Sequence, residues 1–175
     1  ADYPNLRSEF AKILSDLKKG PVTTSIKNPF TQKPETVTFR YTSFITGVRS
    51  LLYSTSGSQW LPALIHDAAL GNFAPGIEYT VGYLRSINEF YNDGRYLCFH
   101  CTEHEPHINH QAARLAAEDS FMGTYRLQQQ KQACDLWVRG DLPEGFFDLR
   151  ELQIPTLVFS GEFDPVTPRE FGDIL

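Results

Sequence analysis

A short apolar run near residue 158 constrains the fold more than any other stretch of the sequence. It covers residues 156–159, Thr-Leu-Val-Phe, with Pro155 before it and Gly161 after it. A run of this length, rich in β-branched and aromatic residues, is typical of a strand that is covered on both faces, as in a parallel sheet. The turn that follows presents one carboxylate, Asp164, just beyond the expected carboxyl end of that strand.

Asp164 is the first candidate functional residue. In open parallel sheets, functional groups collect beyond the carboxyl ends of the strands, which is where Asp164 is expected. The alternative interpretation is a turn-forming aspartate in front of Pro165, a common arrangement. Residues 167–170, Thr-Pro-Arg-Glu, match a capping box with proline in the first helical position, so a helix is expected to begin there.

Helical patterns dominate the sequence before this stretch. Apolar residues recur at three- and four-residue spacing over 6–17, and Lys-Lys-Gly-Pro ends that pattern. Two short β-rich runs on either side of a polar loop predict a hairpin of strands 22–26 and 35–41. Further helices are expected over 60–71, 78–91 and 112–137, the last with a break near Gly123, and one more around Phe44 to Leu52 with Thr42 or Ser43 as its cap. Loops are expected over 54–58 and 140–152.

Composition and charge limit the classes of partner. The formal net charge is −5 with both signs mixed along the chain, which argues against nucleic acid and against an anionic membrane surface. A hydrophobic content of 41% predicts a packed core. No apolar run approaches the ~20 residues of a membrane-spanning helix. The first residues lack the basic start and apolar core of a signal peptide. No cofactor motif occurs, so no cofactor is expected.

Cysteines and histidines gather between Cys98 and His110. The three cysteines, an odd count, leave open either one disulfide with one free thiol or three reduced thiols. Cys98 and Cys101 match the C-x-x-C pattern that is common as one half of a zinc site, and several histidines follow them. All these candidates crowd into one short stretch, whereas a full site needs its second pair at a distance, so we expect no metal. His66, which lies among apolar residues, is interpreted as a structural histidine.

Residues 154–168, Ile-Pro-Thr-Leu-Val-Phe-Ser-Gly-Glu-Phe-Asp-Pro-Val-Thr-Pro, closely resemble the acid-bearing strand and loop of α/β-hydrolases with a Ser-Asp-His triad. More narrowly, they are similar to proline iminopeptidases and tripeptidyl aminopeptidase-like serine peptidases. Segments similar to landmarks of that branch occur at 6–21, 51–53, 60–71, 101–103 and 134–137. The resemblance implies an α/β-hydrolase fragment: a mainly helical cap with a small hairpin over 1–150, and the strand, turn and helix of the sheet over 151–175.

The same resemblance implies roles for several residues. Asp164 would be the acid of the triad. Glu103, with Glu105 as a neighbour that could share the role, would bind the free α-amino group of a peptide substrate by charge-assisted hydrogen bonds; the alternative is a solvated acidic loop. Cys101 and Cys134 would be disulfide partners, as in secreted members, and Cys98 the spare. A secreted or periplasmic protein is therefore expected.

Two parts of the triad are missing from the sequence. There is no Gly-x-Ser-x-Gly turn, and all five histidines precede Asp164, which is the wrong order for this fold. The serine is therefore expected before residue 1 and the histidine after residue 175, and the chain alone is expected to be inactive. Two alternatives are a non-catalytic helical module that binds peptide or protein, and an α/β-hydrolase acting on small esters or epoxides. The substrate preference and the oligomeric state do not follow from the sequence.

Overall fold

A computed structural model describes residues 2–148, 153–164 and 166–173, and it divides the chain into two compact units. The first unit comprises residues 1–90 and 159–175, and the second comprises residues 91–158. The expected boundary at residues 150 and 151 lies outside the described residues. No helix in the described part of the chain is long and apolar enough to cross a bilayer.

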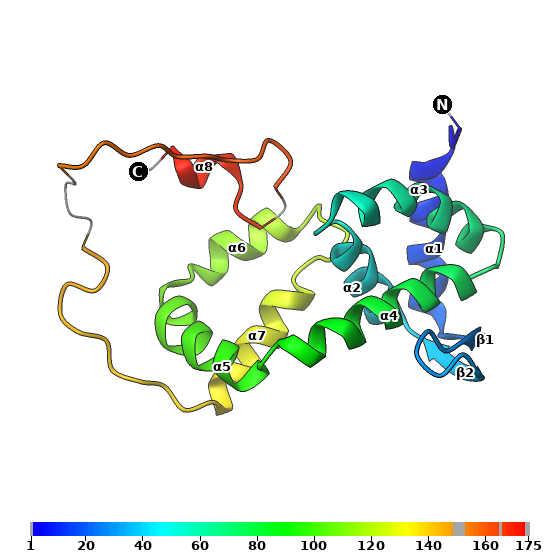
Figure 1. Cartoon of the computed structure of the whole chain (residues 1–175), viewed down its shortest axis with the longest axis horizontal. Coiled ribbons are helices and arrows are strands. Elements are labelled where there is room, and N and C mark those ends of the chain that lie inside the picture. Colours follow the sequence, from blue (N-terminus) through cyan, green and yellow to red (C-terminus); the bar gives the residue numbers. More distant parts are fainter. Residues whose placement is uncertain (1, 149–152, 165, 174–175) are drawn as a thin grey trace. The chain divides into compact units, whose positions relative to one another are not determined.

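Four long helices and a hairpin build the first unit (Figure 1). The helices are α1 (Leu6–Lys19), α2 (Tyr41–Leu51), α3 (Thr55–Ala69) and α4 (Ala74–Phe90). Strands β1 (Val22–Lys27) and β2 (Pro34–Phe39) pair antiparallel, with Val22 opposite Phe39 and Lys27 opposite Pro34. The helix expected over 6–17 and the hairpin are therefore confirmed. The expected end of the second strand at residue 41 is wrong, since β2 ends at Phe39 and Tyr41 begins α2.

The core of the first unit is aliphatic and aromatic. One face of α1 buries Ile13 and Leu17, α2 buries Ile45 completely, and β1 contributes Ile26. Between α2 and α4 the helices approach closely at Gly47, where an added Cβ would lie 2.7 Å from the Thr80 hydroxyl oxygen.

Two helix starts differ from the expectation. We expected residues 54–58 to be a loop, but α3 begins at Thr55 because the Ser54 hydroxyl accepts a hydrogen bond from the Gly57 amide at 3.0 Å. Such a bond satisfies one of the free amides of a helix N-terminus and favours helix in a small-residue stretch. The caps expected for α2 are also wrong, since that helix begins at Tyr41 after Arg40 and has no side-chain cap.

In the second unit, the described residues form helical segments joined by loops. They are α5 (Asp93–Phe99), a π-helix η1 (His100–His104), a 3-10 helix η2 (Glu105–His107), α6 (His110–Ala117) and α7 (Tyr125–Leu136). The expected break near Gly123 is confirmed, since that residue has φ +50° between α6 and α7. The side chains of Asn92 and Asn109 cap α5 and α6.

The expected α/β-hydrolase fragment is wrong. The structure is mainly helical, and the only sheet among the described residues is the two-stranded hairpin. Residues 153–164 contain no strand, and the side chains of Leu157 and Phe159 are 76% and 86% exposed. A strand of a parallel sheet needs neighbours for its backbone amides and carbonyls and a cover for its side chains, and the described part of the chain supplies neither.

Candidate functional site

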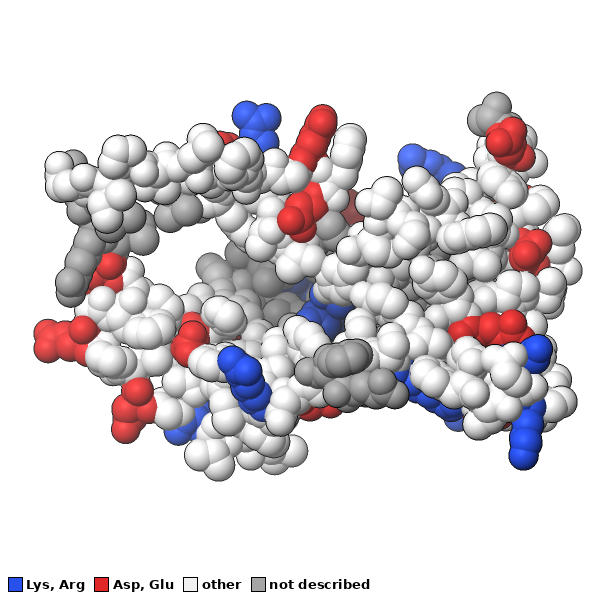
Figure 2. Space-filling model, in the orientation of Figure 1, with Lys and Arg blue, Asp and Glu red and all other residues white. Residues whose placement is uncertain are grey.

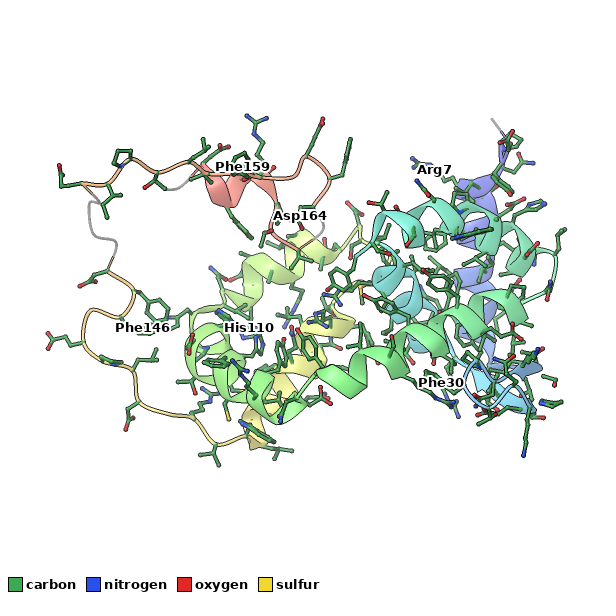
Figure 3. The ribbon with its side chains drawn as sticks, in the orientation of Figure 1. Arg7, Phe30, His110, Phe146, Phe159 and Asp164 are labelled. Atoms are coloured by element: carbon green, nitrogen blue, oxygen red, sulfur yellow. A yellow bond between two sulfur atoms is a disulfide. The ribbon has the colours of Figure 1, made fainter. Side chains whose placement is uncertain are left out.

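Asp164 lies on the loop between the extended segment 153–160 and the short helix α8 (Arg169–Gly172), as Figure 3 shows. Its Oδ1 accepts hydrogen bonds from the amides of Val166 at 2.8 Å and Thr167 at 3.0 Å. Its Oδ2 accepts one from the Thr167 hydroxyl at 2.7 Å. These contacts fix the carboxylate in one orientation and leave Oδ2 with capacity for a further donor.

The charge of Asp164 is stabilised by the same contacts. The Thr167 amide, then the Val166 amide and the Thr167 hydroxyl, hold the pKa of Asp164 below its ordinary value of 3.8. A carboxylate that accepts several hydrogen bonds loses them on protonation, so its charged form is favoured. Asp164 is therefore ionised at neutral pH.

The loop chemistry differs from the expected capping box. The Thr167 hydroxyl donates to Asp164 and does not cap the helix. Pro168, expected in the first helical position, is the residue before α8, which has no side-chain cap. The capping box is therefore wrong, because the Asp164 carboxylate takes the Thr167 hydroxyl and the Thr167 amide that the box would have used.

An open hollow borders Asp164 within the first unit. Its lining comes from the end of α2, the start of α3 and the loop itself, and the lining residues are Leu52, Tyr53, Ser54, Thr55, Ser58, Gly161, Phe163, Asp164 and Val166. The set combines apolar side chains, four hydroxyls and one carboxylate. No histidine is among these lining residues. The hollow gives a ligand or an approaching side chain access to Asp164.

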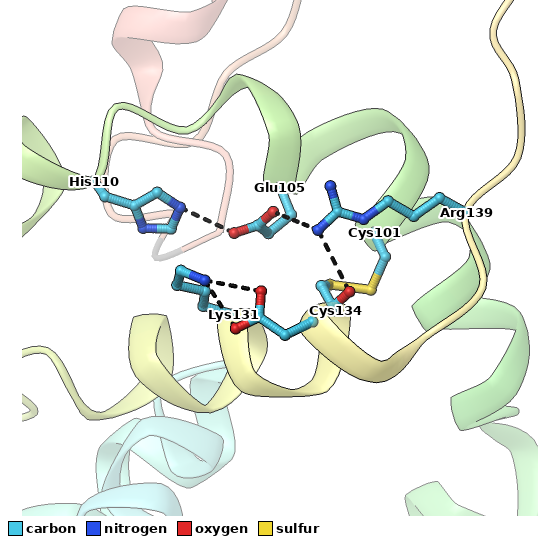
Figure 4. Close-up of polar contacts among 7 residues, drawn as sticks. Cys101, Glu105, His110, Lys131, Cys134 and Arg139 are labelled. Carbon is cyan, nitrogen blue, oxygen red and sulfur yellow. Dashed lines mark hydrogen bonds and ion pairs between the residues drawn. A yellow bond between two sulfur atoms is a disulfide. The ribbon is translucent and has the colours of Figure 1, made fainter.

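A second group of polar residues surrounds Glu105 in the second unit (Figure 4). The Glu105 side chain is only 7% exposed. Its Oε1 lies 2.9 Å from Nε2 of His110, and its Oε2 accepts a hydrogen bond from Nη2 of Arg139 at 3.3 Å. A buried carboxylate is stable only when it is paired, and both oxygens of Glu105 have partners. Glu105 is therefore occupied by the protein itself.

A disulfide lies beside this group. It joins Cys101 to Cys134, the pair that the resemblance implied, and both residues are buried. The same Arg139 Nη2 that contacts Glu105 also donates to the Cys134 carbonyl at 3.4 Å. Cys98 is exposed and has a free thiol.

Glu103 differs from Glu105 in its surroundings. It is half-buried on the π-helix η1, and its side chain makes no hydrogen bond or ion pair with any residue that the structure describes. Single-turn π-helices occur frequently at functional sites. Of the two glutamates, Glu103 is the one whose carboxylate has no partner among the described residues.

The histidines between His100 and His110 have different neighbours, although the rings of His100 and His104 lie 5.8 Å apart between centroids. His107 packs against Phe147, and His110 contacts Glu105. His100 is buried and stacks on Tyr96, and burial, followed by the charges of His104 and Arg126, lowers the pKa of His100 below 6.5. Within the described residues, no three His, Cys, Asp or Glu side chains gather to hold a metal ion.

His66 contacts a carboxylate on another helix, and the charges elsewhere on the visible face are mixed. His66 lies with its Nδ1 2.9 Å from Oε1 of Glu9, which joins α3 to α1. On the face seen in Figure 2, acidic and basic side chains are interspersed and no large patch of one sign is formed.

Sequence reasoning missed Arg139, because nothing in the spacing of Arg139 and Glu105, 34 residues apart, signals a contact.

Comparisons with protein-family models, with curated proteins and with solved structures found no match for this chain.

Proposed function

We propose that this chain is part of a serine aminopeptidase, which releases residues or short peptides from peptide N-termini by a Ser-Asp-His mechanism. The observation that carries the proposal is the state of Asp164. Its carboxylate is ionised and borders an open hollow. It accepts hydrogen bonds from the amides of Val166 and Thr167 and from the Thr167 hydroxyl. The proposal depends on these side-chain contacts and not on a strand before the loop.

In this mechanism Asp164 accepts a hydrogen bond from Nδ1 of a histidine and so selects its tautomer. The histidine removes the proton of the nucleophilic serine, and the carboxylate stabilises the imidazolium that forms. Oδ2 is the oxygen suited to accept the histidine's hydrogen bond, because Oδ1 already accepts hydrogen bonds from two backbone amides. The serine and the histidine would be supplied by further parts of the parent protein, so the 175-residue chain alone should be inactive.

Glu103 would bind the α-ammonium group of the substrate. An exopeptidase must recognise a free N-terminus, and a partly desolvated carboxylate does so by charge-assisted hydrogen bonds. The support for Glu103 over Glu105 is that the Glu105 carboxylate is already paired with His110 and Arg139. The disulfide supports a secreted or periplasmic location, since disulfides persist in oxidising compartments.

The test of the acid is Asp164→Asn in the parent protein, assayed on prolyl- and tripeptidyl-arylamides. Asparagine keeps an oxygen for the two amides and removes the charge, so the loop should be retained. We expect kcat to fall by about a thousandfold or more, because the histidine loses its orienting partner. Asp173→Asn, at an exposed aspartate of the same segment, is the matched control and should leave kcat unchanged.

Activity that survives Asp164→Asn would show that the acid lies elsewhere. A folded parent protein that cleaves neither arylamide would contradict the peptidase proposal and favour a helical peptide-binding module. Glu103→Gln should raise KM for substrates with a free N-terminus far more than for N-blocked ones, and equal effects on both would remove the amine-binding role.

A further inference from the structure

Three separate tethers hold the turn that carries Glu103. Cys101 is bound covalently to Cys134. The Thr102 hydroxyl accepts a hydrogen bond from the Gly140 amide at 3.0 Å. Glu105 Oε2 accepts one from Arg139 at 3.3 Å. All three join the turn to the end of α7 or to the residues just after it.

Glu103 is therefore flanked on both sides by fixed residues while its own carboxylate stays unpaired within the described structure. Preorganised groups bind a ligand more tightly because the ligand does not have to order them. A turn tethered in this way is suited to present one carboxylate in a constant position.

Among the three tethers, the one through Arg139 is electrostatic. The Glu105 carboxylate is nearly inaccessible to solvent, and Arg139 supplies the permanent positive charge beside it, whereas His110 is charged only when protonated. Without Arg139, a buried carboxylate would keep a single partner and would be driven towards solvent. Any such shift of Glu105 displaces the turn two residues from Glu103.

We infer that Arg139 is a positioning residue for the amine site: it acts through Glu105 to hold the Glu103 carboxylate where it meets the substrate's α-ammonium group. This inference rests on the proposed function. Arg139 makes no contact with Glu103 in the described structure, and its guanidinium reaches the site through Glu105 and the Cys134 carbonyl.

The experiment is Arg139→Met in the parent protein, assayed on a tripeptidyl-arylamide and on its N-acetylated counterpart. We expect KM for the free-amine substrate to rise about tenfold, because displacement of a supporting residue typically weakens a site by that order. Both kcat values and KM for the acetylated substrate should change less than about twofold. Arg139→Lys should recover part of the loss, since lysine restores the charge without the planar fork.

Arg114→Met is the matched control, because Arg114 is an exposed arginine on α6 of the same unit, and it should leave all constants unchanged. If Arg139→Met does not fold, Glu105→Gln takes its place: it removes the charge pair while it keeps the shape of the side chain. The same selective rise in KM is expected.

The outcomes separate this inference from the proposed function. If Glu103→Gln leaves amine recognition unchanged, the amine-binding role of Glu103 is wrong. If Glu103→Gln raises KM for free-amine substrates but Arg139→Met and Glu105→Gln do not, the amine site stands and the positioning role of Arg139 is wrong. Equal rises for free and acetylated substrates in Arg139→Met would also overturn the inference, since they would report general destabilisation.

Discussion

Replacing both disulfide cysteines by alanine should unfold the second unit selectively. The unit contains very little other buried material: among its described residues only Cys101, Cys134, His100 and Glu105 are buried, and the two cysteines are its only buried hydrophobic residues. The disulfide is therefore both the covalent link and the apolar core of the described residues of this unit.

The magnitude follows from the length of the loop that the disulfide closes. Cys101 and Cys134 are 33 residues apart. The loop-closure relation gives a loss of about 4 kcal/mol at 25 °C when such a cross-link is removed from the unfolded chain. A typical domain has only about 5–15 kcal/mol of stability in total, so a unit with so small a core should not stay folded after this loss.

The measurement is hydrogen exchange of the Cys101→Ala, Cys134→Ala double variant, with guanidinium unfolding followed by circular dichroism. Amides of α5, α6 and α7 should lose their protection, while those of α1 to α4 keep it, because those helices pack around a separate core. Cys98→Ala is the matched control, since that thiol is exposed and free.

Two outcomes would refute this reasoning. Protection of α5 to α7 that changes by less than about 1 kcal/mol would show that the disulfide contributes little to the stability of the second unit. An equal loss of protection in α1 to α4 would show that the two units do not unfold independently.

Two further predictions concern the first unit. Gly47→Ala should destabilise it by about 1–3 kcal/mol in thermal unfolding, because the new methyl group would lie 2.7 Å from the Thr80 hydroxyl oxygen. Gly82→Ala is the control: Pro29 comes no closer than 3.5 Å to the new methyl group, so this variant should be neutral or more stable by up to about 1 kcal/mol. A Gly82→Ala variant less stable than Gly47→Ala would contradict the packing of α2 on α4. The Asp164 carboxyl should titrate below 3.8 in an NMR pH series, and Thr167→Ala should raise that midpoint by removing the hydroxyl donor. Since folding lowers the pKa of Asp164, its contribution to stability should be complete at pH values above the ordinary pKa of 3.8 and should be lost as the pH falls through the pKa of the folded protein. A titration midpoint at or above 3.8 would contradict the hydrogen-bonded loop.

Several elements could be predicted from local patterns. The amphipathic spacing of α1 and the two β-rich runs of the hairpin each specify their structure within a few residues. The start of α3 was missed, although Ser54 carries the signal of an N-cap, because the small residues after it also suit a loop. Asp164 was identified from its turn, but its hydrogen bonds to Thr167 compete with the helix cap that the same residues predicted.

The sequence by itself determined most of the longer helices, the hairpin and the position of one carboxylate in a turn, because these depend on neighbours within a few residues. Only the tertiary structure decided that residues 156–159 form no strand, because a strand depends on partners that no local pattern supplies. Only the tertiary structure distinguished Glu105 from Glu103, because the pairing of Glu105 with Arg139 brings together residues 34 positions apart. Among the described residues, the buried Glu105 carboxylate has partners and the Glu103 carboxylate has none.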